Sequence, residues 1–366
     1  MLKKEYYILN VLRGLSALFV LFYHFFVFFF AHPDVWFVYL QVEPLELPQP
    51  FYLEALTDFP VDIGHLGVSY FFLISGFLIH ASLQRYDSFK AFIIHKVLRL
   101  WPTYFVCFAL GLLSVAFFNY LLERPFPFTW DHVLACFFWM RDILNYPYID
   151  GAVWTLEIQI KFYIFAILVW CIWKKKFLDK VCLLAVLLSF AVYGVYYFTQ
   201  DGDYSWFYLV LLARRSLKFF MLLLLGTCIY SYFKKEESKL KIFFLSSILL
   251  LCFLSPLFSS PSYSKTVSYL LGFVSFFFFV HFYAQRMKLE GRLGKSINWV
   301  SDISYPLYIG HVLPGYMIMY YMIEMGYNVY LGILFALIYL FPMATIVHRK
   351  IEIVFEKIMP ARPKSG

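Results

Sequence analysis

Ten stretches of about 20 mostly apolar residues follow one another along the chain, each long enough for a helix to cross a bilayer core. They lie near 8–30, 64–84, 101–122, 153–173, 178–199, 214–233, 241–259, 266–284, 303–323 and 329–348. A backbone that crosses lipid must satisfy its own hydrogen bonds, and a helix does so within one segment. The sequence therefore predicts an all-α integral membrane protein with about ten transmembrane helices.

The composition agrees with this fold class and excludes a single soluble domain. Of the 366 residues, 62% are apolar and 15% are charged, whereas soluble domains are about 45–50% apolar and about 25% charged. An eleventh apolar run, 132–140, is too short to span and is expected to lie at the interface or to re-enter. Because no cleavable signal is evident, we expect the first span to stay in the membrane.

Positive charges are distributed unevenly between the two sides of the predicted bundle. Of the 31 Lys and Arg residues, 23 fall on the side that holds both termini, 5 on the other side and 3 within spans. By the positive-inside rule, both termini are expected in the cytoplasm. The net charge of +8 thus records orientation and gives no reason to expect nucleic-acid binding. The absence of Asn-x-Ser/Thr sites favours a bacterial over a eukaryotic surface setting, and we expect a multi-pass protein of the bacterial inner membrane.

The segment 31–63 is predicted to be a loop that covers the external face, because it holds four Pro, six carboxylates and no Lys or Arg. We expect one membrane domain over residues 1–350 and a short basic cytoplasmic tail over 351–366. The six Cys lie in apolar runs, and no His or carboxylate pair has the spacing of a metal site. No metal is therefore expected.

Ionisable side chains inside a predicted span are costly, so by default they mark functional or paired positions. The first span holds Arg13 and His24, which are eleven residues apart and therefore lie on one stripe of a helix. Arg13 would lie near the cytoplasmic end, and His24 would lie well inside the membrane. The alternatives are a snorkelling arginine and a core histidine bonded to a carbonyl.

Three further polar features leave two interpretations each. Glu157 and Lys161 are an i, i+4 pair that is predicted to be mutually neutralising, unless the carboxylate orients the first span's histidine or an acceptor hydroxyl. His311 is either a tether between spans or a chemical group. Lys96 and Arg99 share a helical face on the cytoplasmic side, where they either set the topology or bind phosphate groups.

Five motifs occur in chain order. They are Arg13-Gly-Leu-Ser-Ala-Leu with His24, Gly67-Val-Ser-Tyr-Phe-Phe-Leu-Ile-Ser75-Gly76-Phe77-Leu, Lys96-Val-Leu-Arg99-Leu-Trp101-Pro102, Trp154-Thr155-Leu156 with Phe162-Tyr163, and Ile303-Ser304-Tyr305-Pro-Leu-Tyr308-Ile-Gly-His311. Each is weak alone, but together they resemble the acyltransferase-3 family of integral membrane acyltransferases, known for O-acetylation of bacterial surface polysaccharides. The resemblance covers residues 5–355, and ten spans with both ends inside is the family's layout.

The resemblance implies transfer of an acyl group, usually acetyl from cytoplasmic acetyl-CoA, to a hydroxyl of a cell-surface carbohydrate or lipid-linked glycan. Acyl-CoA is then a donor substrate, and no permanently bound cofactor is expected; the other partners are the glycan and membrane lipids. The resemblance assigns catalysis to His24 and Arg13, and acyl-CoA binding to Lys96 and Arg99, with Lys96 replacing the family's Arg. The residues expected to support the site or to bind the acceptor are Ser75, Trp154, Glu157, Tyr163, Tyr305 and His311. The family's Glu in the fourth span is Gln159 here.

The expected mechanism has neutral His24 accept the proton of a sugar hydroxyl as it attacks the thioester, a contribution of typically 10²–10⁴-fold. An acyl-histidine intermediate and direct transfer are both open. Three other functions are weighed against this one. They are a polysaccharide or lipid transporter with Arg13 and His24 as a gating or proton-relay pair, N-acylation of an amino sugar, and a scaffold without chemistry, which the buried charges disfavour.

Overall fold

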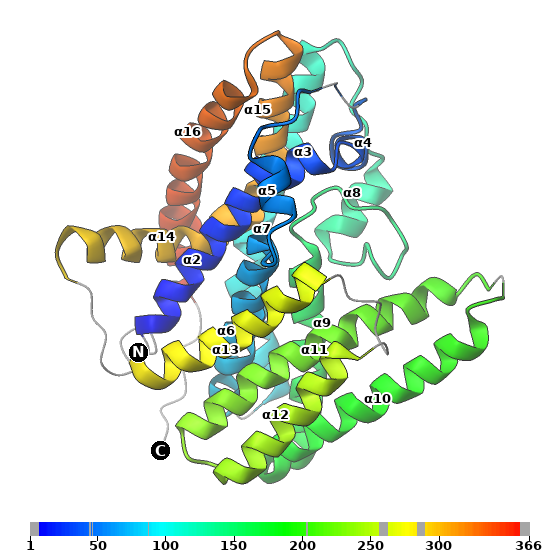
Figure 1. Cartoon of the computed structure of the whole chain (residues 1–366), viewed down its shortest axis with the longest axis vertical. Helices are drawn as coiled ribbons and strands as arrows, with labels where there is room; N and C mark the ends of the chain where they lie inside the picture. The colour runs from blue at the N-terminus through cyan, green and yellow to red at the C-terminus, as the bar shows by residue number, and fades with distance from the viewer. Residues whose placement is uncertain are drawn as a thin grey trace.

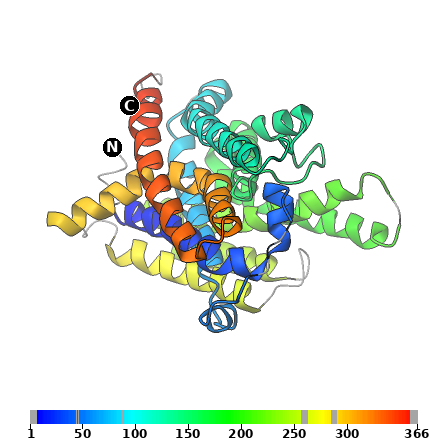
Figure 2. The same ribbon diagram turned by 90° about the horizontal axis from the view of Figure 1, so that it is seen from above.

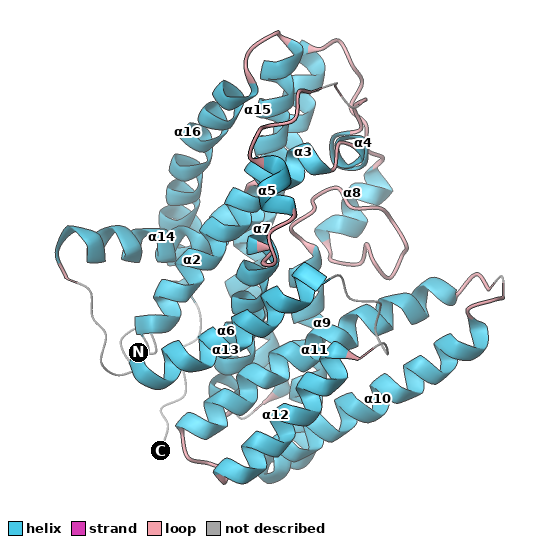
Figure 3. Ribbon diagram, in the orientation of Figure 1, coloured by secondary structure: helices cyan, strands magenta, loops and turns pink. Residues whose placement is uncertain are grey.

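The chain is described by a computed structural model that covers residues 7–358 except 44, 46, 87, 203, 256–262 and 284–289. Every regular element in these ranges is a helix (Figures 1 and 3), so the predicted all-α fold class is confirmed. Lys3, Lys4 and residues 359–366 of the predicted tail lie outside the described residues. The part of the tail that is described continues as helix to Ile358.

Each predicted span falls on helical structure. The elements, in chain order, are α2 (Tyr7–Tyr23), the π-helix η1 (His24–Phe28) and α3 (Phe29–Ala31), α6 (Ile63–Leu83), α7 (Phe89–Leu121), α9 (Trp154–Trp173), α10 (Phe177–Thr199), α11 (Phe207–Phe233), α12 (Lys239–Leu254), α13 (Tyr263–Tyr283), α14 (Gly291–Gly310) with α15 (Val312–Glu324), and α16 (Val329–Val347). A 3-10 turn, η2 (Lys174–Lys176), joins α9 to α10, and the π-helix η3 (His348–Glu352) joins α16 to α17 (Ile353–Ile358).

Six helical stretches in the described ranges are long and apolar enough to cross a membrane, and one of them, Trp154–Thr199, contains two of the predicted spans. Two of the three predicted spans outside these six stretches have visible reasons: α12 has 16 residues, and the ninth span is broken. The third is α11, whose first half carries Arg214, Arg215 and Lys218. The total of ten crossings and the cytoplasmic side of the termini stay predictions.

The ninth predicted span, 303–323, is not one helix. The chain turns at His311, where α14 ends and α15 begins (Figure 1). Pro314 has no N–H to donate to the carbonyl of Gly310, four residues earlier, so the helical ladder is interrupted there. The expectation of a continuous helix is therefore wrong at this point, and the break places His311 at a junction.

The motif Lys96–Pro102, predicted at the cytoplasmic end of the third span, belongs to the span's own helix. Ser88 caps α7 by accepting a hydrogen bond from the Ala91 N–H at 3.1 Å, so the helix begins well before the predicted start at residue 101. Its 33 residues rise by about 50 Å, more than a bilayer core of about 30 Å. Lys96 and Arg99 are thus held on a rigid helix.

Two of the segments between predicted spans contain short helices. The predicted external loop 31–63 holds only α4 (Asp34–Leu40) and α5 (Leu53–Thr57) among its described residues, and the short apolar run at 132–140 falls on α8 (Trp130–Phe137). Figure 2 shows the ends of α10 and α11 projecting from the rest of the bundle. The expectation that neither segment is a span agrees with these lengths.

The centre of the bundle is α6, which packs against α2, α11 and α13. Glycines allow the closest of these approaches. A Cβ built at Gly76 would lie 1.7 Å from the carbonyl oxygen of Leu223 in α11, and one at Gly226 would lie 2.2 Å from that of Leu73 in α6. Because both obstacles are backbone atoms, the helices must separate to admit a methyl group.

We predict that Gly76→Ala destabilises the protein by about 1–3 kcal/mol or more, since overpacking forces backbone shifts. The control is Gly194→Ala in α10, where nothing lies within 4 Å of the added Cβ. That change should be neutral or stabilising by about 0.5–1 kcal/mol. Thermal unfolding of detergent-solubilised variants measures both effects, and equal melting temperatures for the two variants would contradict the packing argument.

Candidate active site

Two histidines from opposite ends of the sequence meet inside the bundle. His24 begins the π-helix η1, and its Nδ1 lies 2.5 Å from Nε2 of His311 at the α14–α15 junction. Their rings stack with centroids 4.8 Å apart, and His311 is 1% exposed. Short π-helical stretches often occur at functional sites. The sequence indicates each histidine separately, but only the folded chain brings them together.

The hydrogen bonds of this pair assign the protons of the two neutral rings. His311 Nδ1 lies 2.8 Å from the carbonyl oxygen of Tyr308, which can only accept, so this nitrogen carries the hydrogen. Nε2 of His311 is then the acceptor, and Nδ1 of His24 must donate to it. The remaining nitrogen of His24, Nε2, therefore holds a lone pair that can accept a proton.

Hydrogen bonds from neighbouring residues hold the backbone of His24 and the helix α14 that leads to His311. The Tyr316 hydroxyl in α15 donates to the carbonyl of His24 at 3.2 Å, and that carbonyl also accepts the N–H of Phe29, five residues on. Arg13 donates to the carbonyl of Ser301 in α14 at 3.1 Å. Arg13 and His24 thus both contact α14 or its junction with α15, which agrees with the prediction that they lie on one stripe.

A cavity of about 480 Å³ opens beside this pair, a volume within the usual range for ligand pockets. Its walls come from α2, α6, α7, α9, α14 and the η3–α17 segment. Six of the ten residues singled out in the sequence line it, namely Arg13, Ser75, Lys96, Arg99, Tyr163 and Tyr305. Tyr308 and Ile309 also line the cavity, and the Tyr308 carbonyl binds His311, so the histidine pair lies directly behind this wall.

The cavity concentrates charge. Besides Arg13, Lys96 and Arg99, its lining includes a fourth cation, Arg85, which the sequence analysis missed. Three carboxylates face the same space, and they are Asp302, Glu352 and Glu356. Lys96 is 7% exposed, and its ammonium lies 4.5 Å from the centroid of the Tyr163 ring. The site can therefore bind a ligand that carries both anionic groups and hydrogen-bond donors.

Gln159, which replaces the family's Glu, lines this cavity, and the Tyr163 hydroxyl donates to its Oε1 at 3.4 Å. Glu157 does not line it. The position that departs from the family pattern is thus the one that faces the cavity, and its amide is uncharged. The sequence analysis identified Gln159 as this departure, and a search for polar residues flanking the motif helices would also have found Arg85.

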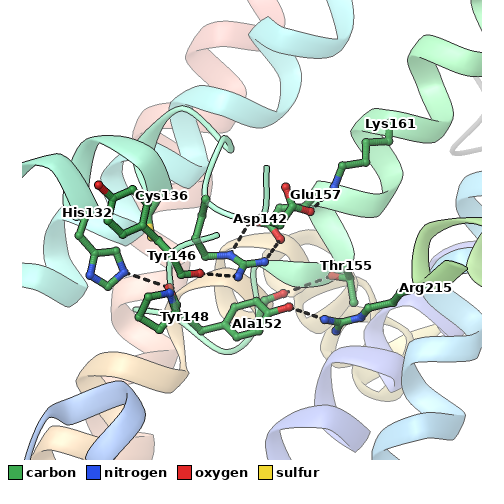
Figure 4. A network of polar contacts seen from close by, with 12 residues as sticks. His132, Cys136, Asp142, Tyr146, Tyr148, Ala152, Thr155, Glu157, Lys161 and Arg215 are labelled. Atoms are coloured by element: carbon green, nitrogen blue, oxygen red, sulfur yellow. Dashed lines mark hydrogen bonds and ion pairs between the residues drawn. The ribbon is translucent and has the colours of Figure 1, made fainter. Parts of the chain in front are cut away.

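The predicted pairing of Glu157 with Lys161 is wrong. Arg141 donates to both carboxylate oxygens of Glu157, at 2.9 and 2.7 Å, and Lys161 pairs with Asp142 instead (Figure 4). Residues 141 and 142, in the loop between α8 and α9, thus form ion pairs that hold this loop against α9. Glu157 is 1% exposed, so losing Arg141 would leave a buried charge, which costs about 3–5 kcal/mol.

The first turn of α9 connects this loop to the histidine pair. The Thr155 hydroxyl lies 2.9 Å from the Tyr308 hydroxyl and 3.3 Å from the carbonyl oxygen of Ala152 in the loop. Tyr308 in turn binds His311 through its carbonyl. Trp154 does not line the cavity; its ring packs against Phe219 at 5.0 Å between centroids.

A buried carboxyl lies in the same loop. Asp150 is 5% exposed, and its Oδ1 accepts the Ala152 N–H at 2.8 Å. Burial raises the pKa of Asp150 from 3.8 to about 7, although the hydrogen bond from Ala152 opposes the shift. The loop therefore contains an acid that titrates near neutrality.

We predict that Asp150→Asn stabilises the protein at pH 8 but not at pH 4. With a folded pKa above the unfolded one, the wild type loses stability as pH rises from about 4 to about 7, by up to about 4 kcal/mol. The amide keeps the hydrogen bond from Ala152 without the buried charge.

Melting temperatures across this pH range measure the difference between the two proteins. Asp131→Asn is the control, because that carboxylate is exposed and hydrogen bonds from Thr129 and then Tyr146 lower its pKa to about 2. The control should gain nothing as pH rises. A pH-independent difference between Asp150→Asn and the wild type would contradict the prediction.

Comparison with known proteins adds family information to this geometry. The model of the acyltransferase-3 family, described as an acyltransferase domain, matches residues 6–347. A 124-residue stretch is 32% identical to Nodulation protein 10 of Rhizobium leguminosarum bv. viciae, covering 30% of this chain and 34% of that protein. The match thus spans about a third of the length of this curated relative. No solved structure matches the chain.

Proposed function

The chain belongs to the acyltransferase-3 family, and from that premise we propose that it transfers an acyl group, acetyl in the simplest case, from cytoplasmic acyl-CoA to a hydroxyl of a cell-surface or lipid-linked glycan. The observation that carries the proposal is the hydrogen-bonded pair of His24 and His311 directly behind a cavity lined by four cations. The pair offers a base, and the cavity offers a place for an anionic donor.

In the proposed step, Nε2 of His24 takes the proton of the acceptor hydroxyl as its oxygen attacks the thioester carbonyl. The carbon–sulfur bond then breaks, and the CoA thiolate recovers the proton from His24. The acyl ester and CoA are the products, so atoms and charge balance. His311 is a positioning residue, because its Nε2 accepts from Nδ1 of His24 and thereby holds the ring in the tautomer that leaves Nε2 basic.

The donor is proposed to bind with its phosphates near Arg13, Arg85, Lys96 and Arg99. Charge-assisted contacts from arginine suit phosphate oxygens, and Lys96 contributes a single point charge. The carboxylates of Asp302 and Glu352 in the same lining could accept from hydroxyl or amino groups of the nucleotide. The thioester arm would extend along Tyr308 and Ile309 toward the histidine pair.

We predict that His24→Ala lowers acyl transfer by about 10²–10⁴-fold, because the general base is lost. His311→Ala should lower kcat by a smaller factor, and His311→Gln should restore part of it by returning an acceptor near the position of Nε2. Thioester cleavage by purified, folded variants measures these rates. Wild-type rates for His24→Ala would refute the mechanism, and acceptor movement without acyl-CoA consumption would indicate a transporter.

We predict that Arg85→Ala raises KM for acetyl-CoA about tenfold. One charge-assisted contact is worth about 1.5 kcal/mol of binding free energy, which corresponds to about a tenfold change in affinity. The same variant should leave KM for S-acetyl-pantetheine, which lacks the phosphates, nearly unchanged. Arg292→Ala is the control, because Arg292 is an exposed cation of α14 that does not line the cavity. Equal effects of Arg85→Ala on both donors would contradict phosphate binding in the cavity.

A further inference from the structure

Arg215 in α11 is an exposed cation held in a fixed orientation. Its Nη1 donates to the Tyr148 hydroxyl at 2.5 Å, and its guanidinium carbon lies 4.7 Å from the centroid of the Trp154 ring. Figure 4 shows the side chain reaching toward Tyr148 beside Thr155. No carboxylate is paired with it among the residues that the structure describes.

The other arginines of the predicted external side are occupied. Arg124 pairs with Glu324 at 3.1 Å, and Arg141 is bound to Glu157 at 2.7 Å. Arg214 is 8% exposed and lies 3.5 Å from the centroid of the Tyr196 ring. Arg215 differs from all three because its charge is exposed and already oriented. Such a group binds an incoming anion without first losing side-chain freedom.

A row of ring-to-ring contacts connects Trp154, which lies beside Arg215, to His24 through five helical segments. The contacts, with centroids 5.0–6.3 Å apart, run in the order His24, Tyr23, His65, Tyr269, Phe219 and Trp154. Tyr23, His65 and Trp154 are partly exposed, whereas Tyr269 and Phe219 are buried and connect them. Aromatic rings with polar edges suit a ligand that has both apolar faces and hydroxyl groups.

We propose that Arg215 binds a single anionic group, a carboxylate or a phosphate, of the glycan whose hydroxyl is acylated at His24. The proposal rests on the proposed function only in naming the glycan as the acceptor. In this arrangement the sugar lies against the partly exposed rings of Trp154, His65 and Tyr23, and the anionic group lies against the guanidinium. Arg215 then decides which glycans are accepted, and it touches no reacting atom.

The external segment 31–63 limits the charge of such a ligand. Its six carboxylates repel a polyanion that approaches the same face, whereas one isolated negative charge can be recognised locally by an oriented arginine. Lipid phosphates share this chemistry, but Trp154 belongs to the first turn of α9, where Thr155 binds the Tyr308 that contacts His311. This link to the histidine pair favours an acceptor over a lipid head group.

The test is binding of matched disaccharides to the full-length protein in phosphatidylcholine nanodiscs. One disaccharide of each pair carries a uronic acid or a sugar phosphate, and the other carries the reduced carboxyl or the free hydroxyl. We expect the wild type to bind the acidic member at least about tenfold more tightly, as one charge-assisted contact implies. Arg215→Gln should remove this preference, Arg215→Lys should keep part of it, and Arg124→Gln should leave it intact.

The proposal is overturned if the wild type shows no acidic preference or if Arg215→Gln keeps it. It is also overturned if adding phosphatidylglycerol to the discs abolishes the preference, since Arg215 would then bind lipid head groups. Because binding is measured without turnover, an acidic preference without acyl-CoA cleavage would refute the proposed function and leave the role of Arg215 standing. If the protein instead transfers acyl groups to neutral and acidic sugars and binds both with equal affinity, the role of Arg215 is refuted and the proposed function stands.

Discussion

Inside a lipid bilayer every polar group must find a partner within the protein, and the centre of this molecule is built around that constraint. Regular helical hydrogen bonding is interrupted at two histidines. His24 lies at the start of a π-helix, and His311 lies at the junction between α14 and α15, near Pro314. The interruptions are compensated locally, because the Tyr308 carbonyl binds His311 and the Tyr316 hydroxyl binds the carbonyl of His24. The two interruptions of helical hydrogen bonding thus contain an ordered pair of imidazoles.

Two polar regions are connected to the pair. The cavity gathers cations and carboxylates from six parts of the chain. The loop that Arg141 and Glu157 hold carries Ala152, whose carbonyl contacts Thr155, and Thr155 and its partner Tyr308 also line the cavity. The contact between Thr155 and Tyr308 therefore joins the loop, the cavity wall and the histidine pair.

The sequence predicted helical elements well because apolar length and helical hydrogen bonding are local properties. It failed where a distant partner decides the outcome. Glu157 and Lys161 have ideal i, i+4 spacing, worth about 0.2–0.5 kcal/mol, yet each binds a loop residue instead. A bidentate arginine in a buried site is a stronger partner for a carboxylate than a neighbouring lysine. The length of α7 was underestimated for a different reason, since its first three turns carry Lys90, Lys96 and Arg99 and are not a continuous apolar run.

The sequence by itself determined the fold class, the approximate positions of the helices and the motif residues, because hydrophobic length and residue spacing are written along the chain. It also placed Arg13 and His24 on one stripe. Only the tertiary structure decided that His24 meets His311, that Gln159 and not Glu157 faces the cavity, and that Arg215 lies oriented on Trp154. These are contacts between segments that lie up to 287 residues apart, and helix packing selects them through close approaches such as Gly76 on Leu223. Spacing along one helix carries no information about such packing.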